Sequence, residues 1–284
     1  MRILVWILFM GLFSSVYAKD VLLQAEQAYA NGKYLQAKKI LKRAAHKGNV
    51  LAQVNLGFMY ENGKGIPQAY DKALFWYKKA AKKSNAKAQY NIGYMYETGR
   101  GVEQNITQAL QWYHKAAENQ SVNAAYNLGI IYYNGDKVKQ DYSMAVKWFT
   151  MAAEENDTQS QYNLGVMYET GKGVDKNVST AFKWYEKAAK HHYLDAEYNL
   201  ATLYYEGKAV TQDYVKAAYW YQKAANKGDT EAQFVLGKMF LAGQGVKKNK
   251  IMAYKFWLEA AKRSHQPSQD SLDILCKESP WACK

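Results

Sequence analysis

The sequence predicts an all-α protein: a right-handed α-solenoid of helix-turn-helix repeats with a 36-residue period. Two observations carry this prediction. Six copies of the period follow one another without insertion or deletion, and each copy holds two stretches with the hydrophobic spacing of a helix. Composition agrees, because 284 residues with 49% hydrophobic and 15% aromatic side chains and only three prolines can fill a packed interior. A disordered chain is excluded.

The first 18 residues have the pattern of a secretory signal peptide. Arg2 precedes an apolar run from Ile3 to Phe13, and we expect cleavage between Ala18 and Lys19. The alternative is an uncleaved anchor, but this run is shorter than the roughly 20 apolar residues that span a bilayer. We therefore expect export to a bacterial periplasm or secretion, with no integral membrane segment after cleavage.

Residues 19–48 form an atypical leading helix pair that caps the array. Tyr34, Ala37, Ala44 and Ala45 keep the spacing of a second helix, while the loop before them is short. This pair is therefore expected to cap the N-terminal end of the array.

Six repeats follow over residues 49–264. Their bounds are 49–84, 85–120, 121–156, 157–192, 193–228 and 229–264. In the second helix of the first repeat, Ala73, Trp76, Tyr77 and Ala80 lie at i, i+3, i+4 and i+7, which is one helix face. Later second helices are expected to start at a residue whose side chain accepts backbone N–H groups: Asn105, Asp141, Asn177, Asp213 and Asn249. Ala69 stands at this position in the first repeat and cannot cap.

The first helix of each repeat carries a matching apolar stripe. In the first repeat the stripe includes Ala52, Leu56 and Tyr60, and Gly63 is expected to end the helix in the left-handed conformation. Small residues at fixed places let helix backbones approach, and the aromatic pairs fill the space that remains. A single hairpin cannot bury this face, whereas stacked copies can.

These residues resemble a known family. The pattern A-x-x-x-L-G-x-x-Y-x-x-G-x-G-V, followed by K/Q-A-x-x-W-Y-x-K-A-A, is similar to the Sel1-like repeat, a relative of the tetratricopeptide repeat, over about residues 20–265. The departures are few: Lys137, Ala209, Ala201 and Phe256. The resemblance implies an exported adaptor or scaffold that binds a protein or peptide, and it does not identify the partner.

A polar strip runs along one edge of the predicted first helices. One position holds asparagine in five of six repeats, and we call this set the asparagine row: Asn55, Asn91, Asn127, Asn163 and Asn199. Lys87, Asn123 and Asn134 lie on the same edge. Amides both donate and accept hydrogen bonds, so the strip suits a peptide backbone or a glycan hydroxyl. The other interpretation stays open: each asparagine bonds a neighbouring helix and has a structural role.

Charge narrows the choice of partners. The chain has 38 Lys and Arg against 25 Asp and Glu, a net charge of +13, which favours anionic partners. Nucleic acid is not expected as a partner, because an exported protein is separated from the nucleic acids of the cell. In addition, no continuous basic stripe runs along the repeats. Cell-wall glycan, as in peptidoglycan, or an envelope enzyme is the alternative partner.

No catalytic residue, cofactor site or metal site is predicted. The five histidines and two cysteines lack the spacing of a metal site. Cysteine-rich relatives of the repeat have been discussed as β-lactam-binding or hydrolysing proteins, and Ser84 to Lys87 match S-x-x-K, but the companion motifs are missing. We therefore expect a protein that is not an enzyme.

Residues 265–284 are expected to form a capping helix and a short loop closed by a disulfide between Cys276 and Cys283. Such a loop adds about 2 kcal/mol to the stability of the cap and is expected to hold Trp281 against the end of the solenoid. The alternative is a pair of free thiols with a redox role.

Overall fold

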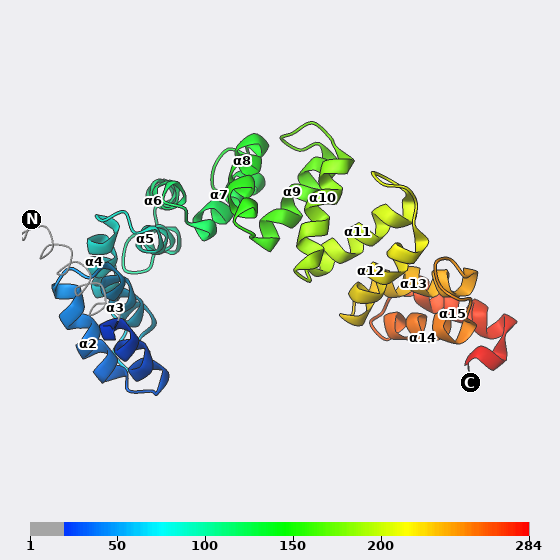
Figure 1. Cartoon of the computed structure of the whole chain (residues 1–284), viewed down its shortest axis with the longest axis horizontal. Helices are drawn as coiled ribbons and strands as arrows, with labels where there is room; N and C mark the ends of the chain where they lie inside the picture. The colour runs from blue at the N-terminus through cyan, green and yellow to red at the C-terminus, as the bar shows by residue number, and fades with distance from the viewer. Residues whose placement is uncertain (1–19, 284) are drawn as a thin grey trace, which may run out of the picture. The chain divides into compact units, whose positions relative to one another are not determined.

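The computed structural model describes residues 20–283, and all regular structure in this range is helical (Figure 1). The predicted signal peptide, residues 1–18, lies outside the described residues. Contacts divide the chain into two compact units between Leu128 and Gly129, inside helix α7 (Val122–Asn134). Each unit is described by itself below.

The first unit begins with the leading helix pair. Residues 20–30 are helical, and the helices that follow are α2 (Tyr34–His46), α3 (Val50–Asn62), α4 (Tyr70–Ala81), α5 (Ala86–Thr98), α6 (Ile106–Glu118) and the start of α7. The helices α3 and α4 pack as one pair and α5 and α6 as the next, and α4 also packs on α5.

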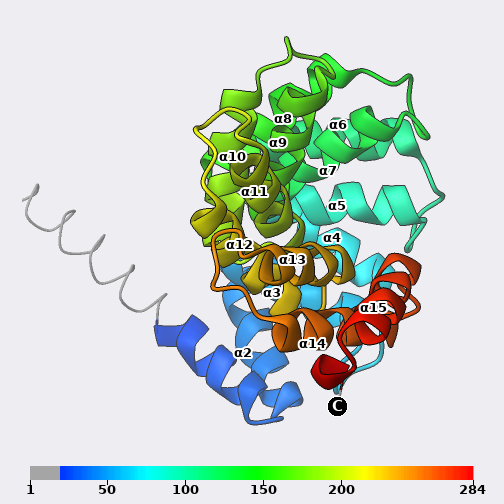
Figure 2. The same cartoon turned by 90° about the vertical axis from the view of Figure 1, so that its right-hand side faces the viewer.

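The second unit repeats this arrangement. Its helices are the end of α7, α8 (Tyr142–Glu154), α9 (Thr158–Thr170), α10 (Val178–Lys190), α11 (Leu194–Glu206), α12 (Tyr214–Asn226), α13 (Thr230–Ala242), α14 (Lys250–Ala261), α15 (Gln266–Glu278) and the 3₁₀ turn η1 (Pro280–Cys283). The capping helix α15 lies against α14 (Figure 2). The prediction of tandem helix pairs that form an α-solenoid is confirmed.

The helix ends are where the sequence places them. The side chain of Asn105 accepts from the backbone N–H of Gln108 at 2.9 Å, and Asp141, Asn177, Asp213 and Asn249 cap their helices in the same way. Ala69 has the same extended backbone and no side-chain cap. Gly63 ends α3 with φ of 63°, in the left-handed region that favours glycine.

The helix glycines face the buried aromatic residue of the second helix. A Cβ atom on Gly57 would lie 2.6 Å from the Tyr77 ring, and one on Gly93 would lie 2.7 Å from the Tyr113 ring. Both tyrosines are fully buried. A side chain on Gly57 or Gly93 would therefore collide with the ring unless the ring moved.

Every junction between successive repeats has one residue in the left-handed region. These residues recur every 36 positions: Gly48, Ser84, Gln120, Asn156, His192, Gly228 and Ser264. The residue after it starts the next first helix, as where the Asn85 side chain accepts from the N–H of Ala88. Within the S-x-x-K match, Ser84 lies in this turn and Asn85 caps the next helix.

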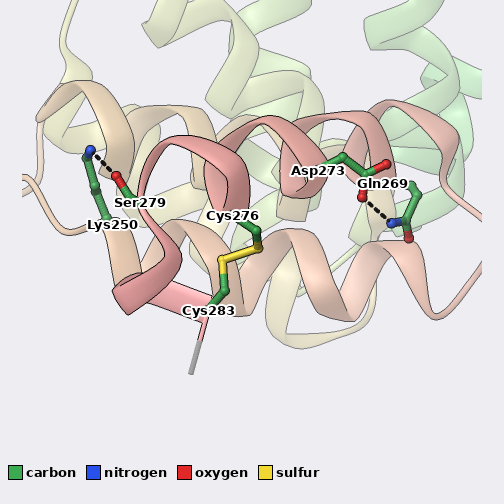
Figure 3. Close-up of a disulfide and its surroundings, with 6 residues drawn as sticks. All are labelled: Lys250, Gln269, Asp273, Cys276, Ser279 and Cys283. Carbon is green, nitrogen blue, oxygen red and sulfur yellow. Dashed lines mark hydrogen bonds between the residues drawn. A yellow bond between two sulfur atoms is a disulfide. The ribbon is translucent and has the colours of Figure 1, made fainter.

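The C-terminal cap contains the disulfide between Cys276 and Cys283 (Figure 3). Beside it, Lys250 of α14 donates a hydrogen bond to the hydroxyl of Ser279 at 2.6 Å and so holds the end of α15. The expectation for Trp281 is wrong, because this side chain is 62% exposed. The turn η1 directs Ala282 inward instead, and Ala282 is buried.

Candidate binding surface

The polar strip lies on accessible parts of the first helices. Lys87, Asn123 and Asn134 are exposed. The asparagine row is half-buried in both units: Asn55, Asn91 and Asn127 in the first, Asn163 and Asn199 in the second. Each row asparagine is therefore partly accessible to solvent.

A pocket of about 440 Å³ lies in the first unit where α5 and α7 begin. It brings three of the predicted residues together: Lys87, Asn91 and Asn123. Tyr90, Gln120 and Ser121 complete its polar lining. Sequence reasoning missed Gln120 and Ser121, because they lie in the junction between repeats and outside the helical strip.

Asn55 lies elsewhere in the first unit. It lines a separate pocket of about 320 Å³ beside Glu26, Tyr29 and the exposed Phe58. Asn134 is the last residue of α7, at the opposite end of that helix from Asn123. The predicted residues therefore do not form one cluster.

The row asparagines also contact tyrosines of the preceding repeat. The amide of Asn127 donates to the hydroxyl of Tyr90 over 3.5 Å, at the outer limit of a hydrogen bond. Burial raises the pKa of Tyr90, and the contact with Asn127 opposes this shift. Contacts with Asn91 and Asn199 likewise oppose the rise that burial causes in the pKa of Tyr77 and Tyr185 on the second helices. The structural interpretation of the row thus has a physical basis, and the binding interpretation stays a prediction.

Beneath this edge lies a second polar feature that sequence reasoning missed. The hydroxyl of Tyr77 donates to the carboxylate of Glu61 at 2.7 Å, and Tyr185 donates to Glu169 at 2.6 Å. Tyr113 makes the same bond to Glu97. Burial, with the adjoining carboxylate, raises the pKa of all three tyrosines far above the ordinary value of 10.0.

A signal for these pairs is present in the sequence. Where the first position holds glutamate, at 61, 97 and 169, the residue 16 positions later is tyrosine. Where the first position holds Tyr133 or Leu241, the residue 16 positions later is Phe149 or Trp257, which has no hydroxyl. Tyr221, which follows Tyr205, shares a hydrogen bond with Thr202 at 2.9 Å instead. The hydroxyl and the carboxylate therefore occur together in three repeats because each satisfies the other in the buried interior.

Within residues 20–283, no group of three or more His, Cys, Asp or Glu side chains is placed to hold a metal ion. Each helix in the same range is too short or too polar to cross a bilayer.

Comparison with known proteins places the repeats in a family. The Sel1 repeat model matches residues 50–85, 86–121, 122–157, 158–193, 194–229 and 230–265. No curated protein matches the chain.

Two solved structures are similar over most of the chain. A protective antigen of uropathogenic Escherichia coli strains is 34% identical over 95% of this chain, with a TM-score of 0.84, and this chain spans 59% of that protein's length. A Sel1 repeat protein from Oxalobacter formigenes is 33% identical over 91% of this chain and 76% of its own, with a TM-score of 0.68. The six matched repeats and these two similarities show that the chain belongs to the Sel1 repeat family.

Proposed function

We propose that this chain is an exported, non-catalytic scaffold that binds a protein or peptide on the surface of its first helices. Sel1 repeat solenoids generally serve as scaffolds for protein–protein interaction. The observation that carries the proposal is the pocket at the start of α5 and α7, where Lys87, Asn91 and Asn123 converge.

The lining of this pocket suits an extended peptide. Amides of Asn91, Gln120 and Asn123 offer donors and acceptors for a peptide backbone, and the Lys87 ammonium attracts an acidic side chain or a C-terminal carboxylate. The half-buried Tyr90 ring gives an apolar contact. In this proposal Asn91 both steadies Tyr77 and presents its amide to the ligand.

The proposal that the chain is exported rests on the sequence of residues 1–18 and on the disulfide between the two cysteines. The disulfide between Cys276 and Cys283 indicates an oxidising compartment, as expected for a bacterial periplasm or for secretion.

The proposal that the chain is not an enzyme rests on the placement of Ser84. Its backbone φ of 55° forms the turn at a repeat junction, the same role that Gln120 and Asn156 have in later repeats. A serine in this role needs no catalytic partner, so we expect a Ser84→Ala variant and the parent chain to be equally inert toward a chromogenic β-lactam.

Site-specific photo-crosslinking tests the binding surface. A photoreactive residue at position 87 is expected to capture a discrete partner from an envelope extract, identified by mass spectrometry. The matched control carries the same residue at position 111 on α6, where Gln111 is exposed on a second helix. Equal capture of the same protein at both positions would contradict the proposal.

A second variant separates peptide from glycan. Asn123→Leu is compatible with folding because Asn123 is exposed and no row contact depends on it. We expect this variant to lose the crosslinked partner, while neither it nor the parent chain co-sediments with purified peptidoglycan. Co-sedimentation that the substitution abolishes would identify the glycan as the ligand instead.

A further inference from the structure

The exposed side chains of α2 and α4 are basic at corresponding positions. Both helices follow the second-helix pattern and are offset by 36 residues. Four basic residues lie at the C-terminal end of each helix, in or next to its last turn: Lys42, Arg43, His46 and Lys47 at the end of α2, and Lys78, Lys79, Lys82 and Lys83 at the end of α4. All eight are exposed. We call this surface the α2–α4 face.

The two basic sets lie side by side. The His46 ring packs edge-on against the Trp76 ring with centroids 5.1 Å apart. The Lys83 ammonium donates to the backbone oxygen of Gly48 at 3.2 Å. The helices α2 and α4 belong to the same compact unit. The basic side chains of the two helices therefore form one surface.

The α2 part of this surface is hollowed. Lys39, together with the four basic residues at the end of α2, lines an open hollow of about 580 Å³. Among residues 20–283, the lysines and the arginine of the face have no carboxylate within ion-pair distance. Like charges held together without neutralisation favour an external anion.

The repeat architecture does not require this charge. The C-terminal end of α8 has Thr150, Met151, Glu154 and Glu155 at the positions of the four lysines at the end of α4. Cations near a helix C-terminus stabilise the helix, which could by itself explain lysines at this place. However, α8 ends with two glutamates and is still a helix of similar length, so the fold does not need the cations. The basic α2–α4 face is therefore a property of this end of the chain and not of the fold.

Apolar side chains project among the cations. Leu35 is 71% exposed and lies one and two turns before Lys39 and Lys42 on the same helix face. Phe75 is 51% exposed, and the Lys79 ammonium lies 4.6 Å from the centre of its ring. Basic residues around exposed leucine and phenylalanine are typical of surfaces that bind the interface of an anionic bilayer.

We propose that the α2–α4 face docks on an anionic lipid bilayer. The basic side chains bind lipid phosphate groups, and Leu35 and Phe75 enter the boundary between headgroups and acyl chains. This proposal goes beyond the scaffold function, because the face is separate from the pocket at α5 and α7. A chain docked in this way carries its partner on a membrane surface without a spanning segment.

Vesicle binding tests the proposal, with the chain that remains after the expected cleavage of the signal peptide. The probes are vesicles of phosphatidylethanolamine with phosphatidylglycerol and vesicles of phosphatidylcholine alone. We expect binding to the anionic vesicles only, weakened by added salt. The triple variant Lys39→Glu/Lys42→Glu/Lys82→Glu is expected to lower the apparent affinity roughly tenfold or more. Glutamate is compatible with position 82, because Glu118 and Glu154 occupy this place in later repeats.

A charge-matched control separates the face from net charge. The variant Lys147→Glu/Lys183→Glu/Lys255→Glu makes the same change in net charge at exposed second-helix positions of the second unit, and we expect it to keep anionic-vesicle binding. Equal losses in both triple variants, or no preference of the parent chain for anionic vesicles, would overturn the proposal. Should the first variant misfold by circular dichroism, glutamine at the same three positions is the substitute, with a smaller loss expected.

A further variant separates a bilayer from a soluble polyanion. Phe75→Gln copies Gln111, the residue at the corresponding place on α6, and leaves every cation in position. We expect it to weaken binding to anionic vesicles and to leave binding to heparin unchanged. Unchanged vesicle binding would remove the apolar half of the proposal, and binding to heparin without binding to vesicles would identify a soluble polyanion as the ligand.

Discussion

The tyrosine–glutamate pairs connect the apolar interior of each hairpin to its polar edge. The ring of Tyr185 is fully buried against Gly165, while its hydroxyl donates to Glu169. Burial and the neighbouring carboxylate raise its pKa, so the native chain retains this proton at pH values where an unfolded chain releases it.

This difference predicts alkaline destabilisation. Below about pH 10 the tyrosines are protonated in both states, and their titration has no effect on the free energy of unfolding. Above about pH 10 the unfolded chain loses protons that the native chain keeps, so the free energy of unfolding falls as pH rises. We expect Tyr185→Phe to make this fall less steep, measured by urea unfolding across that range.

The same substitution is expected to cost about 1 kcal/mol at neutral pH, because Glu169 loses its donor. Phe149 shows that phenylalanine fits at this position. Tyr219→Phe is the control, since Tyr219 is 54% exposed, and it is expected to leave the pH dependence unchanged. An equal change in slope from both substitutions would contradict the assignment.

Glu197 is a second residue whose burial has consequences. Its side chain is fully buried and accepts from the Lys227 ammonium at 2.7 Å. The corresponding residues Gln161 and Gln233 donate instead to the backbone oxygens of Ala153 and Ala225. Glu197 has no proton to donate when ionised, so Lys227 supplies its compensation.

Lys227→Ala is therefore expected to lower the free energy of unfolding by about 2 kcal/mol, because it leaves a buried carboxylate without a lysine partner. The double variant Lys227→Ala/Glu197→Gln is expected to recover most of this loss, since glutamine can donate to the oxygen of Ala189. Urea unfolding at neutral pH measures both, with Lys183→Ala as the exposed control. A double variant less stable than Lys227→Ala alone would refute this account.

At the scale of helices, the sequence predicts where the second helices begin better than it predicts the side-chain contacts that these helices make. The caps at Asn105 and Asn177 could be identified because a polar residue recurs at one place just before an apolar stripe. Asn49 and Asp157 cap first helices by the same rule. These caps are harder to recognise in the sequence, because the junction residue before each cap differs from repeat to repeat.

The polar contacts are harder to predict because they need three-dimensional placement. The bond from Tyr77 to Glu61 joins residues of two helices, and the contact between Asn127 and Tyr90 joins two repeats. The sequence fixes which residues share a helix edge but not the angle between hairpins. The sequence does not determine the placement of Trp281 for a related reason, since a ring of eight residues can direct either Trp281 or Ala282 inward.

Because α4 lacks a side-chain cap, a substitution at its N-cap is expected to stabilise the chain, whereas most substitutions destabilise a protein. Ala69 has φ of −152° and ψ of 90°, close to the values of −148° and 100° at Asn105. Ala69→Asn is therefore expected to stabilise the chain by about 0.5 to 1 kcal/mol, read from thermal or urea unfolding. Asn105→Ala, the matched reversal, is expected to destabilise by a similar amount. A neutral or destabilising Ala69→Asn would show that the surroundings of Ala69 do not admit the cap.

At the scale of the whole chain, stability is a sum over hairpins and the contacts between neighbours. The second helix of one repeat packs on the first helix of the next, as α10 does on α11 and α12 on α13. A terminal hairpin has a neighbour on one side only, so the caps at the ends have to compensate for the contacts that are missing.

The disulfide is expected to act on its own end of the chain. In Cys276→Ser/Cys283→Ser, amide hydrogen exchange is expected to accelerate in α15 and then in α14, because η1 and Ser279 lose their tether. Exchange in α3 to α5 is expected to stay the same. Equal acceleration throughout the chain would instead indicate that all the repeats unfold together.

The recurring left-handed residue at each junction sets the increments in which this protein can change its length during evolution. Removing residues 193–228 would join His192, with its positive φ, to Asp229, which caps α13, so the order of turn and cap would be preserved. A deletion from the same starting point that is not a multiple of 36 residues would break this order. Whole repeats can therefore be gained or lost in 36-residue steps with the order of turn and helix cap preserved at each junction.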